Sequence, residues 1–262
     1  MNSEKDLAKA WNYRELLSEL VKREIKSRYK QSILGYAWVL LVPLVNLVVL
    51  TVVFSLFIRI PTGNIPYPIF LFTALVPWTF TANAITFATQ GLVSNTSLIT
   101  KIYLPREIFP IATVFAKLVD YFLTSIILLI FLIIYGVSFE ITMLYIPLIF
   151  FFHLLLVLGV SFILSAINVF FRDVENVLSV FLTIWMYITP VIYPPELIPQ
   201  KFVPIFNLNP MMPIINAYRN TILYGVPPSW QSFSYAAVFS TLIFILGYKF
   251  FRNRSKYFAD VI

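Results

Sequence analysis

Long apolar runs without a single charged residue follow one another along the chain from residue 31 onward. Each run can hold one α-helix of about 20 residues, the length that crosses the hydrocarbon core of a bilayer. We therefore predict an all-α, polytopic membrane protein with six transmembrane helices. The six runs are residues 31–58, 60–100, 121–139, 141–171, 176–195 and 220–248.

The run over residues 60–100 is long enough for two short spans of roughly 20 residues each. We favour one helix over about 69–94, because prolines and a glycine crowd the beginning of the run and polar residues loosen its end. These residues are Pro61, Gly63, Asn64, Pro66 and Pro68 at the beginning, and Asn95, Thr96 and Ser97 at the end.

The composition agrees with a membrane protein, since 60% of the residues are hydrophobic and only 12% are charged. Six spans place both termini on one side of the membrane. That side carries 15 of the 19 Lys and Arg residues, against three on the other side and Lys117 within the membrane. Because cytoplasmic segments carry the excess of Lys and Arg, both termini are predicted to be cytoplasmic. The net charge of +7 then reflects topology and attraction to anionic lipid headgroups, not nucleic-acid binding.

Ahead of the first run, apolar residues recur at helical spacing and cations occupy the other faces of the same predicted helix. This pattern is typical of an amphipathic helix in the cytoplasmic interface of a membrane. Two interpretations stay open for it, a topology and lipid anchor or a docking surface for a soluble partner. The apolar residues are Leu17, Leu20, Val21 and Ile25, and the cations are Lys22, Arg23, Lys26, Arg28 and Lys30.

Prolines are concentrated between residues 194 and 228, which hold eight of the 17 in the chain. A segment this rich in proline cannot continue as one spanning helix. Asn209 is placed to cap a helix with Pro210 in its first turn, and Gly225 can close that helix after about 14 residues. We predict a short re-entrant helical hairpin over 196–228 on the outer side, sheltered by protein or lining a water-filled path. The alternative is a surface hairpin that only packs on the last span.

The sequence offers little for catalysis. It has no G-x-x-x-x-G-K-[ST] phosphate loop, no Cys, and a single His153 in the fourth run. We predict a non-enzymatic chain with no catalytic residue, no metal site and no cofactor of its own.

Lys117 and Asp120 are three residues apart where the third span is predicted to begin, so their side chains can share one helix face. Ionisable groups inside a membrane are expensive and often functional. We favour mutual neutralisation of this intramembrane pair over a role in proton relay.

Aromatic residues make up 18% of the chain. Most are expected to face lipid or neighbouring helices. Apolar rings with a polar edge also suit sugar rings, because the ring faces stack and Tyr hydroxyls bond sugar hydroxyls. Tyr187 and Tyr193, together with Arg219, are therefore candidates for lining a glycan path.

Five strings of sequence carry a more specific resemblance. Together they resemble the membrane subunit of ABC-2 type polysaccharide exporters, the Wzm and teichoic-acid permease family, in the same order and spacing over most of the chain. Thr189 stands before Pro190 where Ser is expected, which keeps the hydroxyl, and residues 121–169 and 235–262 are supported by hydropathy alone. The strings are REIKSRYKQSILGYAWVLLVPL (23–44), SLITKIYLPREIFP (97–110), FFRDVENV (170–177), YITPVIYP (187–194) and LNPMMPIINAYRN (208–220).

The resemblance implies an exporter built from two copies of this subunit and two copies of a separate ABC ATPase, which binds ATP and Mg. In such exporters the interfacial helix and the loop between the second and third spans dock on the ATPases, here residues 14–30 and 95–107. The implied ATPase-coupling residues are Lys22, Arg23, Lys101, Arg106 and Glu107, and the implied lipid-diphosphate contacts are Lys26, Arg28 and Lys30.

The implied cargo is a lipid-linked polysaccharide of O-antigen, capsule or teichoic-acid type, moved from the cytoplasm across the bacterial inner membrane. Two alternatives stay open, an ABC-2 exporter of a small molecule or lipid and an ion-coupled secondary transporter. We predict one transmembrane domain over 1–262. Its parts are an interface helix (1–30), spans one to five (31–195), the outer hairpin (196–228), span six (231–251) and a cytoplasmic tail (252–262).

Overall fold

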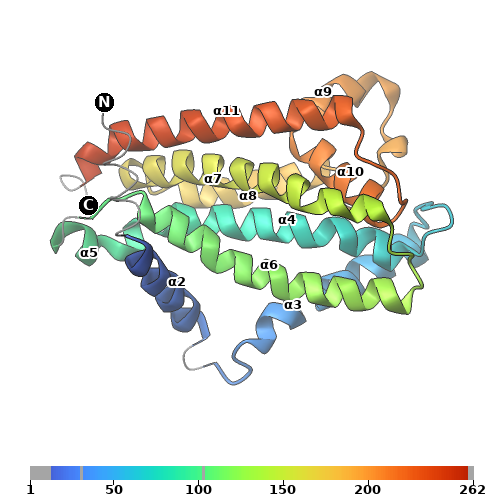
Figure 1. The fold of residues 1–262 in the computed structure, drawn as a ribbon, viewed down its shortest axis with the longest axis horizontal. Helices are drawn as coiled ribbons and strands as arrows, with labels where there is room; N and C mark the ends of the chain where they lie inside the picture. The colour runs from blue at the N-terminus through green and yellow to red at the C-terminus, as the bar shows by residue number, and fades with distance from the viewer. Residues whose placement is uncertain (1–12, 30–31, 102–103, 259–262) are drawn as a thin grey trace.

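The computed structural model describes residues 13–29, 32–101 and 104–258, and in these ranges the chain is helical with no strand. Five helical segments of the described chain are long and apolar enough to cross a membrane. Helix α4 (Tyr67–Gln90) lies at the centre of the bundle, three of the other segments pack against it, and the last segment packs against the one before it (Figure 1). These others are α3 (Ala37–Thr51) with η1 (Val52–Phe57), α6 (Ile108–Ile134), η3 (Ile141–Tyr145) with α7 (Ile146–Phe170), and α11 (Trp230–Arg254).

Helix α4 is buried on nearly all sides, with 78% of its most apolar window inside the molecule. Its neighbours α6, α7 and α10 (Met211–Ile222) cover it from different directions. By contrast, only 17% of the corresponding window of α3 and η1 is buried. The membrane or another protein chain must therefore cover most of this first helix, because its exposed residues are mainly aliphatic.

Helices α7 and α11 cross closely where two glycines face one another. A Cβ atom on Gly159 would lie 2.6 Å from the backbone nitrogen of Phe244, and a Cβ on Gly247 would meet the backbone of Gly159. Small residues at such a crossing let two helix backbones approach and gain dispersion contacts, which stabilise helix pairs in lipid.

The fifth predicted span appears as α8 (Val174–Ile188), an apolar helix of 15 residues. At 1.5 Å per residue it is about 22 Å long, shorter than the five candidate spans, which have 21 to 30 residues. The helix ends because Thr189 is extended and Pro190 follows it. Five long spans and one short apolar helix thus stand where the sequence predicted six full spans.

The proline-rich segment forms turns and short helices at the end of the bundle opposite α2 (Arg14–Tyr29) and α5 (Thr96–Lys101) (Figure 1). The side chain of Asn209 accepts a hydrogen bond of 3.0 Å from the backbone N–H of Met211, which caps the last of these helices. Gly225 follows that helix with a φ of 63°. The elements are η4 (Pro195–Leu197), η5 (Gln200–Phe202), α9 (Val203–Asn207) and α10 (Met211–Ile222).

At the other end, the beginning of α2 (Arg14–Tyr29) and the end of α11 lie on the same side of the bundle as η2 (Val93–Asn95) and α5 (Thr96–Lys101) (Figure 1). Helix α6 begins at Ile108, well before residue 121, where the uncharged run begins. The prediction that Lys117 and Asp120 lie at the start of the third span is therefore wrong. They lie inside α6, because an ion pair on one face neutralises both charges and lets the helix continue.

Candidate functional site at the charged end and along the bundle

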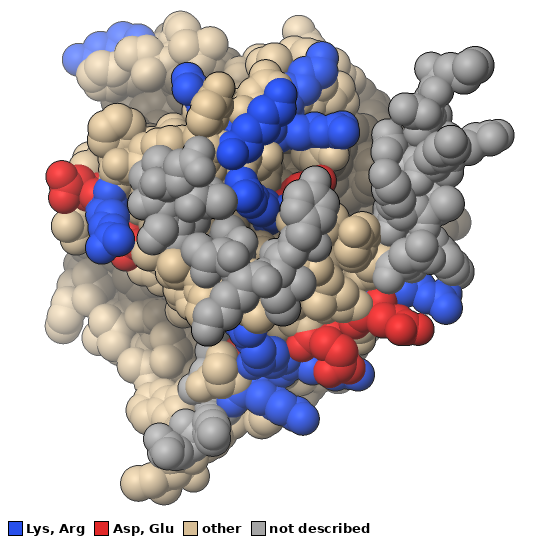
Figure 2. All heavy atoms as spheres, turned by 90° about the vertical axis from the view of Figure 1, so that its left-hand side faces the viewer, with Lys and Arg blue, Asp and Glu red and all other residues tan. Residues whose placement is uncertain are grey.

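Lys and Arg side chains gather on the end of the molecule that carries α2, α5 and the last turn of α11 (Figure 2). Acidic side chains are fewer on this face. Such a surface can attract anionic headgroups or an acidic face of a partner protein.

A hydrogen bond joins the two segments that were predicted to dock on an ATPase. The Arg23 guanidinium of α2 donates to the side-chain oxygen of Asn95, which lies in the turn after α4. Asn95 is only 8% exposed, and its amide nitrogen donates to the carbonyl of Gly91 at 2.7 Å. Helix α2 is thus fixed to the end of the central helix by a charge-assisted contact between residues that are 72 positions apart.

The other predicted coupling residues lie on α2, at the end of α5 and just before α6. Lys22 is exposed and donates to Glu19 at 2.8 Å, a contact that lowers the pKa of the Glu19 carboxyl. The Arg106 guanidinium lies 6.0 Å from the centroid of the Phe258 ring, and Glu107 is half-buried at the residue before α6. Lys101 ends α5, and the position of its side chain lies outside the described structure.

The three cations predicted to meet a lipid diphosphate occupy the end of α2 and the residues after it. Lys26 is exposed on α2. Arg28 belongs to the same helix, although its side chain lies outside the described structure, and Lys30 lies outside the described residues. Their role stays a prediction.

A second polar network holds the beginning of α8. The Glu175 carboxylate accepts hydrogen bonds from Gln90 at 3.1 Å and from Asn168 at 2.9 Å. Asn168 is fully buried and also donates to the carbonyl of Thr89 at 3.1 Å. These contacts connect α8 to the ends of α4 and α7, and sequence spacing gave no signal for them.

Lys117 and Asp120 meet inside α6, where Nζ lies 3.1 Å from Oδ2. The Lys117 ammonium also lies 3.9 Å from the centroid of the Phe87 ring, a favourable cation–π position. Both residues line a cavity of about 440 Å³ between α3, α4 and α6. The remaining walls are mostly apolar, with Asn83, Thr79 and Thr124 as further polar members.

A chain of buried hydrogen-bonding groups crosses the middle of the bundle. Nε2 of His153 lies 2.6 Å from the Thr81 hydroxyl, and Nδ1 lies 3.5 Å from the Tyr218 hydroxyl. The Tyr121 hydroxyl donates to that of Tyr218 at 3.5 Å. These contacts connect His153 on α7 to α4 and α10, and they give it partners that the sequence alone did not indicate.

The aromatic and cationic candidates for the path lie around the turn after α8. Tyr187 is exposed on α8, and the Tyr193 hydroxyl donates to its carbonyl at 2.6 Å. Arg219 is only 2% exposed, and it donates to the carbonyls of Pro190 at 2.5 Å and Val191 at 2.6 Å. Its side chain therefore holds the turn that follows α8, and its part in a path stays a prediction.

Several known proteins are similar to this chain over at least 90% of its length. The O-antigen export system permease protein RfbA of Klebsiella pneumoniae is 30% identical over 250 residues, which cover 95% of each chain. RfbA of Myxococcus xanthus is 29% identical over 255 residues, 96% of this chain and 97% of the relative. The polysialic acid transport protein KpsM of Escherichia coli is 25% identical over 243 residues, 90% of this chain and 92% of the relative.

The sequence profile of the ABC-2 type transporters matches residues 15–223, from the beginning of α2 to the end of α10. This range includes the Arg23–Asn95 contact, the Glu175 network and the buried turn held by Arg219. The chain is a multi-pass membrane protein that belongs to the ABC-2 type transporter family.

Proposed function

We propose that this chain is the permease subunit of an ATP-driven exporter that moves a lipid-linked polysaccharide out of the cytoplasm. The observation that carries this proposal is the similarity to O-antigen export permeases over 95% of both chains. The similarity to KpsM, named for polysialic acid transport, extends the same class of cargo to a second kind of glycan. The chain itself is non-catalytic in this proposal.

The energy comes from a separate ABC ATPase that binds ATP and Mg. The sequence has no phosphate loop, so the nucleotide site has to be supplied by another subunit. Helix α2 and residues 95–107 form the docking surface, with Lys22, Arg23, Lys101, Arg106 and Glu107 as its polar contacts. The Arg23–Asn95 hydrogen bond supports this assignment, since it connects the two docking segments directly.

The proposed topology has six spans and two cytoplasmic termini in a bacterial inner membrane. It counts α8 as the fifth span, because this helix is apolar and its outer end continues into the turn that Arg219 buries. The cations on the end of the molecule with α2 support its cytoplasmic placement (Figure 2). The segments between α8 and α11 then lie on the outer side as a re-entrant hairpin.

Two copies of the chain form the exporter in this proposal. The exposed aliphatic faces of α3 and α8 suit the contact between copies and the wall of a path between them. Tyr187, 54% exposed on α8, and its neighbour Tyr193 are placed to stack on sugar rings in that path. Lys26, Arg28 and Lys30 would meet the diphosphate of the lipid carrier on the cytoplasmic side.

The test is reconstitution of the permease with an ABC ATPase of the same genome in vesicles that hold a polyprenyl-diphosphate glycan. We expect the glycan to become accessible to an added glycosidase only when ATP is supplied. A Walker-lysine variant of the ATPase is the matched control. The proposal fails if the permease moves glycan without the ATPase, or if the pair moves only small lipids.

A further inference from the structure

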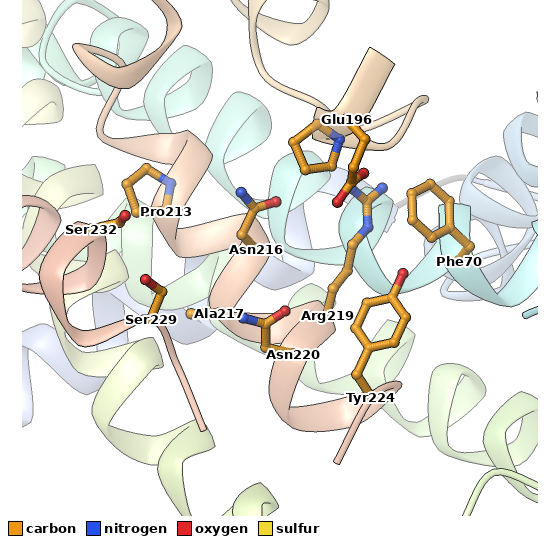
Figure 3. A pocket seen from close by; sticks show the side chains of 11 residues that line it. Phe70, Glu196, Pro213, Asn216, Ala217, Arg219, Asn220, Tyr224, Ser229 and Ser232 are labelled. Atoms are coloured by element: carbon orange, nitrogen blue, oxygen red, sulfur yellow. The ribbon is translucent and has the colours of Figure 1, made fainter. Parts of the chain in front are cut away.

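A polar cavity of about 280 Å³ (Figure 3) lies at the end of the bundle that carries α10 and the beginning of α11, opposite α2 (Figure 1). It is bounded by α10, the first turn of α11, the turn at η4 and the first turn of α4. The side chains of Asn216, Arg219 and Asn220 line it from α10 (Figure 3), and Ser232 adds a hydroxyl from α11. This cavity shares no lining residue with the cavity beside Lys117.

One wall of the cavity is a fixed, buried cation. Two nitrogens of the Arg219 guanidinium are held by backbone carbonyls, and its carbon lies 3.7 Å from the centroid of the Phe70 ring. Burial lowers the pKa of Arg219 to about 9, so the group is still charged at neutral pH. Its Nε–H finds no acceptor among the residues that the structure describes. A ligand oxygen would satisfy this donor, whose burial without a partner is otherwise unfavourable.

The other polar groups of the cavity either only accept hydrogen bonds or both donate and accept them. Glu196 supplies an exposed carboxylate that only accepts, and the amides of Asn216 and Asn220 both donate and accept. Tyr224 adds a phenol and an aromatic face beside them (Figure 3). A mixture of donors, acceptors and rings matches neighbouring hydroxyls on an uncharged sugar. An acidic sugar would instead be repelled by Glu196, and two nitrogens of the Arg219 guanidinium are already engaged by backbone carbonyls.

We propose that this cavity binds one neutral sugar unit of the exported glycan on the outer side of the membrane. Its volume lies just below the range of roughly 300–1,000 Å³ for small-molecule sites, which suits a single ring and excludes an oligosaccharide. The inference rests on the proposed function for its cargo and its sidedness. Its role is to hold a sugar of the emerging chain beside α10.

The test measures sugar binding directly on the full permease in lipid nanodiscs. Saturation-transfer NMR would use the methyl glycosides of glucose, galactose, mannose and N-acetylglucosamine, with methyl glucuronide as the acidic comparison. Asn216→Leu and Asn220→Leu each remove one amide of the cavity with little change of size. Asn207→Leu is the matched control, because Asn207 is exposed on α9 and does not line the cavity.

We expect a saturation-transfer signal from at least one neutral glycoside with the unsubstituted permease and with the Asn207→Leu variant. Each cavity variant should weaken that binding by roughly fivefold, the effect of one lost hydrogen bond. If Asn216→Leu does not fold, Asn220→Leu alone decides. The inference is overturned if no neutral glycoside binds, if methyl glucuronide binds more tightly, or if all variants bind equally. If vesicles with the unsubstituted permease and its ATPase export glycan while no glycoside binds, this site alone is refuted. If glycosides bind but no glycan is exported, the proposed function is refuted.

Discussion

Replacing Arg23 by Ala removes the donor that connects α2 to the turn after the central helix. Asn95 then keeps its own bond to Gly91 but loses the partner of its side-chain oxygen. Helix α2 would no longer move together with the end of α4. We expect a permease that still binds its ATPase but exports less glycan for each ATP hydrolysed.

The size of this effect follows from the burial of the two partners. Leaving a nearly buried amide oxygen without a donor costs about 1–3 kcal/mol, and Asn95 is 8% exposed. The Arg23 side of the contact is exposed, where an ionic group contributes about 1 kcal/mol or less. We therefore expect the contact between α2 and the turn after α4 to be weakened by about 1 kcal/mol. This corresponds to roughly a fivefold fall in glycan exported per ATP.

The assay compares Arg23→Ala with Lys201→Ala in reconstituted vesicles, counting exported glycan and released phosphate together. Lys201→Ala is the matched control, since it also removes one exposed cation but lies in η5, outside the proposed docking surface. Asn95→Ala should lower the glycan exported per ATP more than Arg23→Ala does, because it also removes the bond to Gly91. The double variant should export little less glycan per ATP than Asn95→Ala alone. Equal behaviour of Arg23→Ala and Lys201→Ala, or strictly additive effects of Arg23→Ala and Asn95→Ala, would refute the reasoning.

Three further predictions concern the packing of the spans. Gly247→Ala places a Cβ against the backbone of Gly159, and it should destabilise the helix pair by about 1–3 kcal/mol in thermal unfolding in detergent. Lys117→Met or Asp120→Asn alone leaves one intramembrane charge without its partner, which costs roughly 2.5–3.5 kcal/mol of insertion. Membrane abundance should fall for each single variant and recover in the double variant, whereas a proton relay would lose export in all three. His153→Phe removes a buried bond to a hydroxyl and should lower stability by about 1–3 kcal/mol. Export per folded molecule should stay ATP-dependent.

Much of the helical framework could be predicted from hydropathy and from turn residues. Asn209 and Gly225 marked the two ends of α10 closely, because a side-chain cap and a positive φ are local requirements. The third span was predicted to begin too late, since the uncharged run begins only after Lys117 and Asp120. A proline at position 110, within the first turn of α6, was a usable signal for its true beginning.

The polar networks could not be predicted, because their partners are far apart in the sequence. Gln90 and Glu175 are 85 positions apart, and His153 lies 65 and 72 positions from its two hydroxyl partners. Hydropathy treats each such residue as a single polar position in an apolar run. The packing of α4 against α7, α8 and α10 decides which of them meet.

Arg219 shows how a physical requirement can connect such distant residues. Pro190 prevents α8 from continuing. The carbonyls of Pro190 and Val191 therefore lack the N–H partners that a continued helix would supply. Buried carbonyls need donors, and a guanidinium can supply two of them in a fixed geometry. The turn also receives the Tyr67 hydroxyl, which donates to the carbonyl of Ile192 at 2.8 Å. A proline that ends a helix inside an apolar segment therefore leaves carbonyl acceptors that need donors, and Arg219 of the nearby α10 supplies them.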